Sequence, residues 1–154
     1  MPVTISEIKK SLENRDRSEL LNFCMRLAKF KKENKELLGF LLFEENDIEE
    51  YVARVKEESE LLFKEINMSN VYFIKKSVRK ILKTINKHIR FAGSKQVESE
   101  LLIYFCNSLK AYSIPLDKSR QLKNLYLGQV KKVDAATAAL HPDLQYDLSI
   151  QRNF

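Results

Sequence analysis

The clearest separation of hydrophobic and polar positions in the chain lies in residues 71–91. When these residues are placed at ~100° per residue, as in an α-helix, the aliphatic side chains fall within an arc of about 100°. These side chains are Val71, Ile74, Val78, Ile81, Leu82, Ile85 and Ile89. The cationic side chains gather on the opposite side of the same helix. The pattern therefore predicts a helix that is buried on one side and solvated on the other.

Six other stretches also have helical spacing. Thr4 and Glu7 have the spacing of a capping box, which indicates where the first of these helices begins. Pro115 interrupts the pattern late in the chain, because proline cannot continue a helix. The six predicted helices cover residues 5–14, 16–33, 35–45, 47–67, 95–112 and 116–140.

Two of the predicted helices contain runs that are apolar on all sides. These runs are residues 37–43 and 101–106, and we expect both helices to be covered by neighbours on several sides. The second run also has strand-like composition, and periodicity alone does not distinguish the two for so short a segment. The sequences that flank it favour a helix.

These elements predict an all-α fold of about six or seven helices in antiparallel αα-hairpins. Only three glycines and three prolines are present, which favours long helices over many tight turns. Residues 1–140 are expected to form one helical domain, and residues 141–154 an extended C-terminal tail. The pattern fits a multi-helix bundle or a short α-solenoid that is HEAT-like in architecture, and it leaves this choice open.

Charge and hydrophobicity limit the partners and the cellular location that we expect for the protein. The net charge of +6 is compatible with nucleic acid, acidic proteins or anionic membranes as partners. The longest apolar runs have seven and six residues, whereas a membrane-spanning helix needs ~20. The N-terminal residues have no hydrophobic run of the signal-peptide kind. We therefore expect a cytoplasmic protein without a membrane span.

No catalytic, metal or cofactor motif is visible in the sequence. The only histidines, His88 and His141, have no partner at the spacing of metal ligands. His88 is expected to pack or to form a hydrogen bond. Cys24 and Cys106 lie in apolar stretches and are expected to be buried, reduced thiols. We expect no cofactor and no catalytic residues, while an enzyme with a dispersed site is the third-ranked alternative.

The cationic side of residues 71–91 is the candidate binding site for nucleic acid or an acidic partner. The residues proposed for it are Tyr72, Lys76, Arg79, Lys80, Lys83, Lys87 and Arg90. Regularly placed cations can follow a phosphate backbone, and a tyrosine can stack on a base. The alternative is a solvated face whose edges pair with the acidic helix over residues 47–67.

Good helices without a visible site favour a non-enzymatic protein-interaction module or scaffold. Sequence-independent nucleic-acid binding through the basic face is the alternative. The partner is expected to be another protein, with homo-oligomerisation left open.

Overall fold

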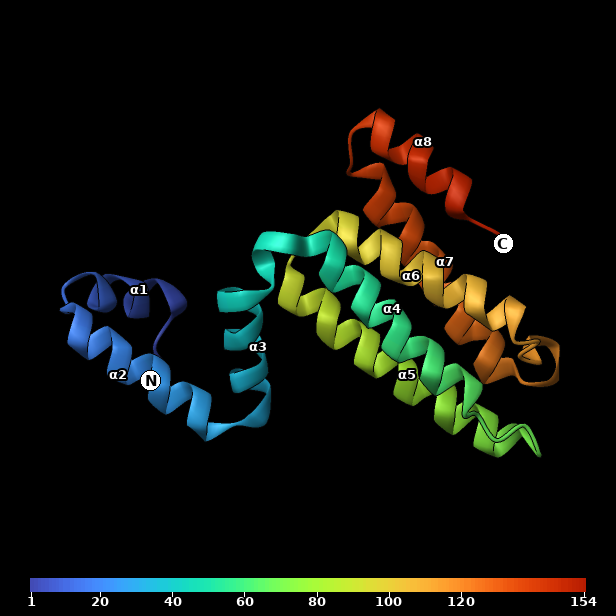
Figure 1. The fold of residues 1–154 in the computed structure, drawn as a ribbon, viewed down its shortest axis with the longest axis horizontal. Helices are drawn as coiled ribbons and strands as arrows, with labels where there is room; N and C mark the ends of the chain where they lie inside the picture. Colours follow the sequence, from blue (N-terminus) through green and yellow to red (C-terminus); the bar gives the residue numbers. More distant parts are fainter. The chain divides into compact units, whose positions relative to one another are not determined.

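The computed structural model describes residues 1–154 and contains eight α-helices and no strand. The predicted all-α class is therefore confirmed, although the expected count of six or seven helices was too low. The helices are α1 (Ile5–Glu13), α2 (Arg17–Phe30), α3 (Lys32–Phe43), α4 (Ile48–Lys64), α5 (Val71–Ala92), α6 (Lys95–Ala111), α7 (Arg120–Ala138) and α8 (Pro142–Gln151). Figure 1 shows them along the chain.

The chain divides into two compact units, Met1–Glu44 and Glu45–Phe154, where the sequence pattern predicts one domain over residues 1–140. The first unit holds α1 to α3, and the second holds α4 to α8. Periodicity does not reveal this division, because it shows which helix faces are apolar and not which of them meet.

Residues 141–154 were expected to be an extended tail, but most of them form α8. Pro142 occupies the first turn of this helix, where its missing N–H costs no hydrogen bond. Beyond α8, Arg152 pairs with Asp134 at 2.7 Å, which holds the chain end against α7. The period of α8 is weak because its apolar side chains are spread around the helix, and the sequence pattern therefore missed it.

The helix α5 has the two sides that the sequence predicts. Val78 and Ile85 are 0% exposed and Ile81 is 2% exposed, so the aliphatic side is buried. The side chain of Asn70 caps the N-terminus by accepting a hydrogen bond from the backbone N–H of Phe73 at 3.0 Å. Gly93 ends the helix with φ +60°, a conformation that glycine adopts without strain.

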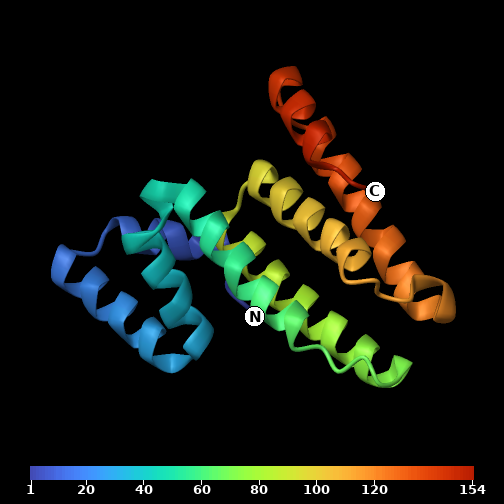
Figure 2. The same cartoon turned by 45° about the vertical axis from the view of Figure 1, so that its right-hand side comes forward.

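The helix α6 lies at the centre of the second unit and packs against α4, α5, α7 and α8. Figure 2 shows α4 beside α5, and α6 beside α7. Leu101, Phe105 and Leu109 of α6 are 0% exposed. Neighbours on several sides are the reason why residues 101–106 carry no polar face. The prediction of a central helix is confirmed here.

The helix α3 was also expected to be covered on several sides, and this was wrong. Phe40 is its only buried residue, and neither α1 nor α2 has any. Within the first unit, α2 packs against α3, and the single residue Lys31 links them in an extended conformation (φ −148°, ψ 140°). Three short helices provide too little surface to cover one another's apolar sides.

None of the eight helices has both the length and the apolar character that crossing a bilayer requires.

Candidate interaction surfaces

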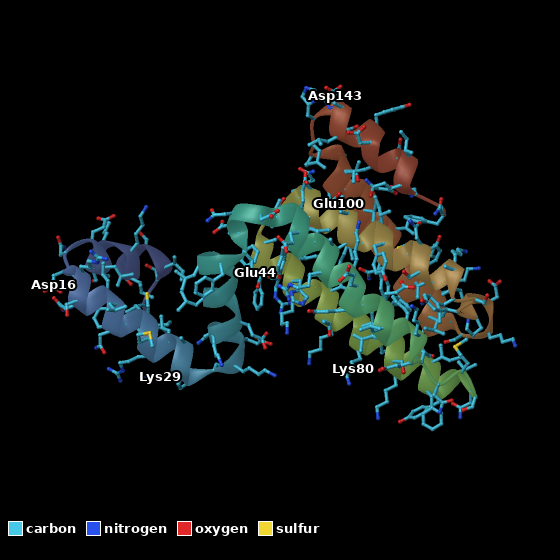
Figure 3. All side chains as sticks on the ribbon, viewed as in Figure 1. Asp16, Lys29, Glu44, Lys80, Glu100 and Asp143 are labelled. Carbon is cyan, nitrogen blue, oxygen red and sulfur yellow. The ribbon has the colours of Figure 1, made fainter.

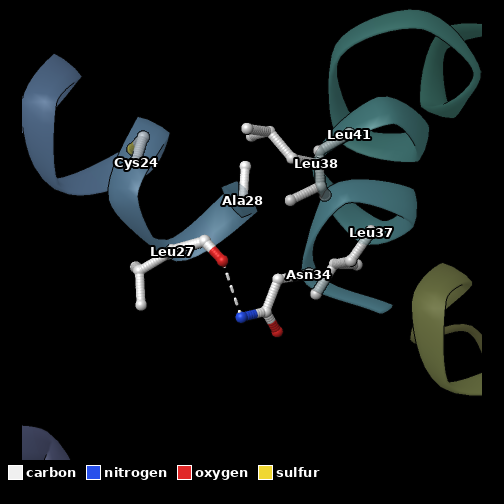
Figure 4. A pocket seen from close by; sticks show the side chains of 7 residues that line it. All are labelled: Cys24, Leu27, Ala28, Asn34, Leu37, Leu38 and Leu41. Atoms are coloured by element: carbon white, nitrogen blue, oxygen red, sulfur yellow. Dashed lines mark hydrogen bonds between the residues drawn. The ribbon is translucent and has the colours of Figure 1, made fainter. Parts of the chain in front are cut away.

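The first unit contains an apolar groove between α2 and α3, with a volume of about 190 Å³. Figure 4 shows the side chains of the two helices facing each other across it. The groove is lined by Cys24, Leu27, Ala28, Asn34, Leu37, Leu38 and Leu41. Six of these seven side chains are apolar or weakly polar, which gives the groove the character of a site for apolar side chains.

Asn34 is the one amide in this lining. Its Nδ2 atom donates a hydrogen bond of 2.8 Å to the backbone carbonyl of Leu27, near the end of α2. This bond satisfies one of the last carbonyls of α2, which have no partner within the helix. The asparagine therefore braces the corner between α2 and α3.

Apolar exposure is high throughout the first unit. Leu27 is 61% exposed, and Phe30 and Phe43 are 84% and 81% exposed. The remaining large hydrophobic side chains of this unit that lie at the surface are Met1, Val3, Ile5, Ile8, Leu12, Leu21, Met25, Leu41 and Leu42. So many exposed large hydrophobic side chains within 44 residues are typical of a unit that interacts with a partner.

The two cysteines differ in their surroundings. Cys106 is buried in α6, as expected, and burial raises the pKa of its thiol to about 12. Cys24 was also expected to be buried, but it is exposed at the groove. Leu27 and Ala28 follow Cys24 in the same apolar stretch, and they line an open groove instead of a core.

The cationic residues predicted as a binding site lie together on the solvated side of α5. Tyr72 is 64% exposed, and Lys87 is half-buried. The other cations at the surface are Lys76, Arg79, Lys80, Lys83 and Arg90. Lys80 is marked on α5 in Figure 3. We call Lys76, Arg79, Lys80, Lys83 and Arg90 the basic face.

No residue of the basic face forms an ion pair, although the acidic helix α4 packs beside α5. On α4, Glu58 instead pairs with Arg54 of the same helix at 3.1 Å. The basic face therefore keeps its charge unneutralised by neighbouring side chains.

A polar cluster joins α4 to α6 in the second unit. Glu60 accepts a hydrogen bond of 2.6 Å from the hydroxyl of Tyr104 and another from the hydroxyl of Tyr112. The ring of Tyr112 also stacks on Phe63, with centroids 5.4 Å apart. The hydrogen bond from Tyr104, followed by that from Tyr112, lowers the pKa of Glu60 below its ordinary value of 4.5. Both phenols are engaged by the carboxylate, so the cluster acts as a structural clamp.

We expect this clamp to make stability depend on acid pH. A carboxylate with a lowered folded-state pKa stabilises the fold above the unfolded-state pKa, and this contribution is lost as the pH falls through the folded-state value. Replacing Glu60 by glutamine should therefore reduce the loss of unfolding free energy between about pH 5 and pH 3. Urea unfolding at several pH values measures this loss. Glu57→Gln, an exposed acid on the same helix, controls for the missing charge. An equal acid loss in Glu60→Gln and wild type would contradict the role of the clamp.

His88 has the structural role expected of it. Its Nδ1 atom shares a hydrogen bond of 2.5 Å with the hydroxyl of Tyr51, and its ring packs edge-to-face on Phe91. No group of three or more potential metal-binding side chains is clustered in the structure.

No protein-family model, curated protein or solved structure matches the chain.

The sequence pattern identified the basic face, but it missed the groove and the Glu60 cluster. The signal for the groove was present, since the apolar side chains of α2 cover an arc of about 220° at ~100° per residue, more than one neighbour can bury. Nothing near Glu60 in the sequence indicates its partners, because Tyr104 and Tyr112 are 44 and 52 residues away.

Proposed function

We propose that the protein is a non-enzymatic protein-interaction module whose first unit binds an apolar helix of another protein. In this proposal the helices of the second unit form a scaffold of αα-hairpins, similar in architecture to a short HEAT-like solenoid. The observation that carries the proposal is the exposed apolar surface of the first 44 residues, of which only Phe40 is buried.

Exposed apolar area is the physical reason for this choice. Each large side chain covered by a partner contributes about 1.5–3 kcal/mol relative to full exposure. Phe30, Phe43 and Leu27 are each more than half exposed and would contribute in this way. A unit of this size gains little from its own packing, so most of its available hydrophobic free energy comes from covering this surface.

The apolar lining of the groove favours a helix as the bound element. Ala28 has a small side chain, and Leu38 and Leu41 lie across from it on α3 (Figure 4). An amphipathic helix places side chains at positions i, i+3 or i+4 and i+7 along one stripe, which suits a groove lined by apolar side chains of two helices. A second copy of the chain is the alternative occupant of the same groove.

A test uses one substitution in the groove and one outside it. Leu41→Lys places a charge in the groove, and Leu61→Lys places one at the comparably exposed Leu61 on α4. We expect Leu41→Lys to bind the wild-type protein's cellular partner at least tenfold more weakly than wild type does, which corresponds to about 1.4 kcal/mol. Leu61→Lys should retain the wild-type affinity. The measurement is the amount of partner that co-purifies with each variant, per molecule of that variant.

Cys24 supplies an independent readout of occupancy. In the purified chain a thiol reagent should modify Cys24 quickly and Cys106 only after denaturation. A helix in the groove should protect Cys24 in the complex. Protection that rises with protein concentration alone would identify a second copy as the occupant. An unprotected Cys24, with equal complex formation by both lysine variants, would reject the proposed function.

A further inference from the structure

The basic face of α5 is a second surface feature, independent of the groove, that the proposed function does not use. The helix α5 contains seven lysines and arginines and no acidic residue. Five of these cations are exposed and form no ion pair. Pairing with the neighbouring acidic helix would explain the segregation of charge, but the structure does not show such pairing for these five residues.

The cations are spread along the helix axis and are densest between Lys76 and Lys83. Lys76 and Arg90 are separated by about 21 Å at 1.5 Å per residue, with one cation for roughly every 5 Å. A linear polyanion carries its charges at close intervals, so several of its phosphates can lie near this row of cations. The geometry therefore suits a phosphate backbone that runs parallel to α5.

An aromatic residue lies at one end of this row. Tyr72 falls at the same angle around α5 as Arg90, and its ring is 64% exposed. The ring of the neighbouring Phe73 lies edge-on to it, with centroids 5.6 Å apart. An exposed aromatic ring stacks on unpaired bases, which a duplex does not present. This feature favours a single strand over a double helix.

A membrane surface fits the same charges less well. A basic amphipathic helix binds a bilayer by inserting its apolar side among the lipids. On α5 this side holds Ile81 and Ile85, which are 2% and 0% exposed in the core of the second unit. The helix cannot insert them without unfolding that core.

We propose that the basic face of α5, together with Tyr72, binds the backbone of single-stranded nucleic acid without sequence preference. The five cations contact phosphates, and Tyr72 stacks on a base. This activity is separate from the binding of a protein helix by the first unit, so either can be present without the other.

The experiment measures fluorescence anisotropy of a labelled, mixed-sequence single-stranded oligonucleotide with the full chain. Release of counterions from about five phosphates predicts a loss of affinity of about 100-fold between 50 mM and 200 mM salt. The charge-reversed variant Lys76→Glu, Arg79→Glu, Lys80→Glu, Lys83→Glu should lose at least that much at low salt. Tyr72→Ala should lose about fivefold or more, and Tyr72→Phe should bind like wild type.

A charge-matched control separates the site from net charge. Lys9, Lys10, Lys131 and Lys132 are exposed and form no ion pair. Their replacement by glutamate changes the net charge by the same amount and should retain most of the affinity. Far-UV circular dichroism confirms that both variants remain folded.

Four results would overturn the proposal. They are equal losses in the two charge-reversed variants, equal affinity for a duplex of the same sequence, equal affinity for polyglutamate, and tighter binding to phosphatidylserine vesicles that the oligonucleotide does not displace. None of these measurements involves the groove between α2 and α3, so a negative result here leaves the proposed function to its own test.

Discussion

Replacing Phe105 by alanine should lower the free energy of unfolding by about 3–5 kcal/mol. Phe105 is 0% exposed at the centre of the second unit, and its ring centroid is 6.0 Å from that of Phe63. The substitution removes the buried ring and leaves a cavity that the surrounding helices fill only in part. Natural domains are stable by only about 5–15 kcal/mol, so this is a large fraction of the total.

A second phenylalanine provides the control for Phe105. Phe30 is 84% exposed, and its replacement by alanine should change the free energy of unfolding by no more than about 0.5 kcal/mol. The chain has no tryptophan, so urea unfolding is best followed by far-UV circular dichroism. Similar losses in the two variants would mean that Phe30 is covered in the free protein and that the exposed surface of the first unit does not exist.

Separating the two units should have the other large effect. A fragment of residues 1–44 should lose most of its helix content, whereas residues 45–154 should keep theirs. The first fragment contains one residue that is buried in the whole chain, Phe40, and its helices are 9, 14 and 12 residues long. Isolated helices of such lengths are marginal in water. The second fragment retains α6 and the helices that cover it.

Far-UV circular dichroism and thermal unfolding of the two fragments measure this effect. The 45–154 fragment should melt in one cooperative transition, and the 1–44 fragment should show a low, gradually changing signal. A cooperative transition in the shorter fragment would show that α1, α2 and α3 form a core by themselves. That result would contradict the proposal that the exposed surface of the first unit is covered by a partner.

The sequence was most informative where a helix is buried on one side. The two sides of α5 follow directly from the spacing of Ile74, Val78, Ile81 and Ile85, all of which are buried. A long helix with strong periodicity contains enough residues for its pattern to stand out. The basic face could be located for the same reason, since cations cannot occupy the buried side without a large desolvation cost.

The errors have a different physical origin. Residues 37–43 and 101–106 have the same all-apolar pattern, but α6 is surrounded and α3 is largely open. An apolar side chain indicates surface that is stabilised by burial, and it does not specify whether the covering surface lies in the same chain. The Glu60 clamp depends on tyrosines from another helix, a contact that local periodicity does not report. The groove and the clamp therefore required the three-dimensional structure.

The corner between α2 and α3 has a consequence for comparison with other sequences. Because Lys31 alone makes this connection, the chain has no spare length there. One residue inserted within either helix would turn the part beyond it by ~100° and present different side chains to the groove. A conserved number of residues between the positions of Cys24 and Leu41 is therefore a better criterion for recognising a distant relative than identity at either position.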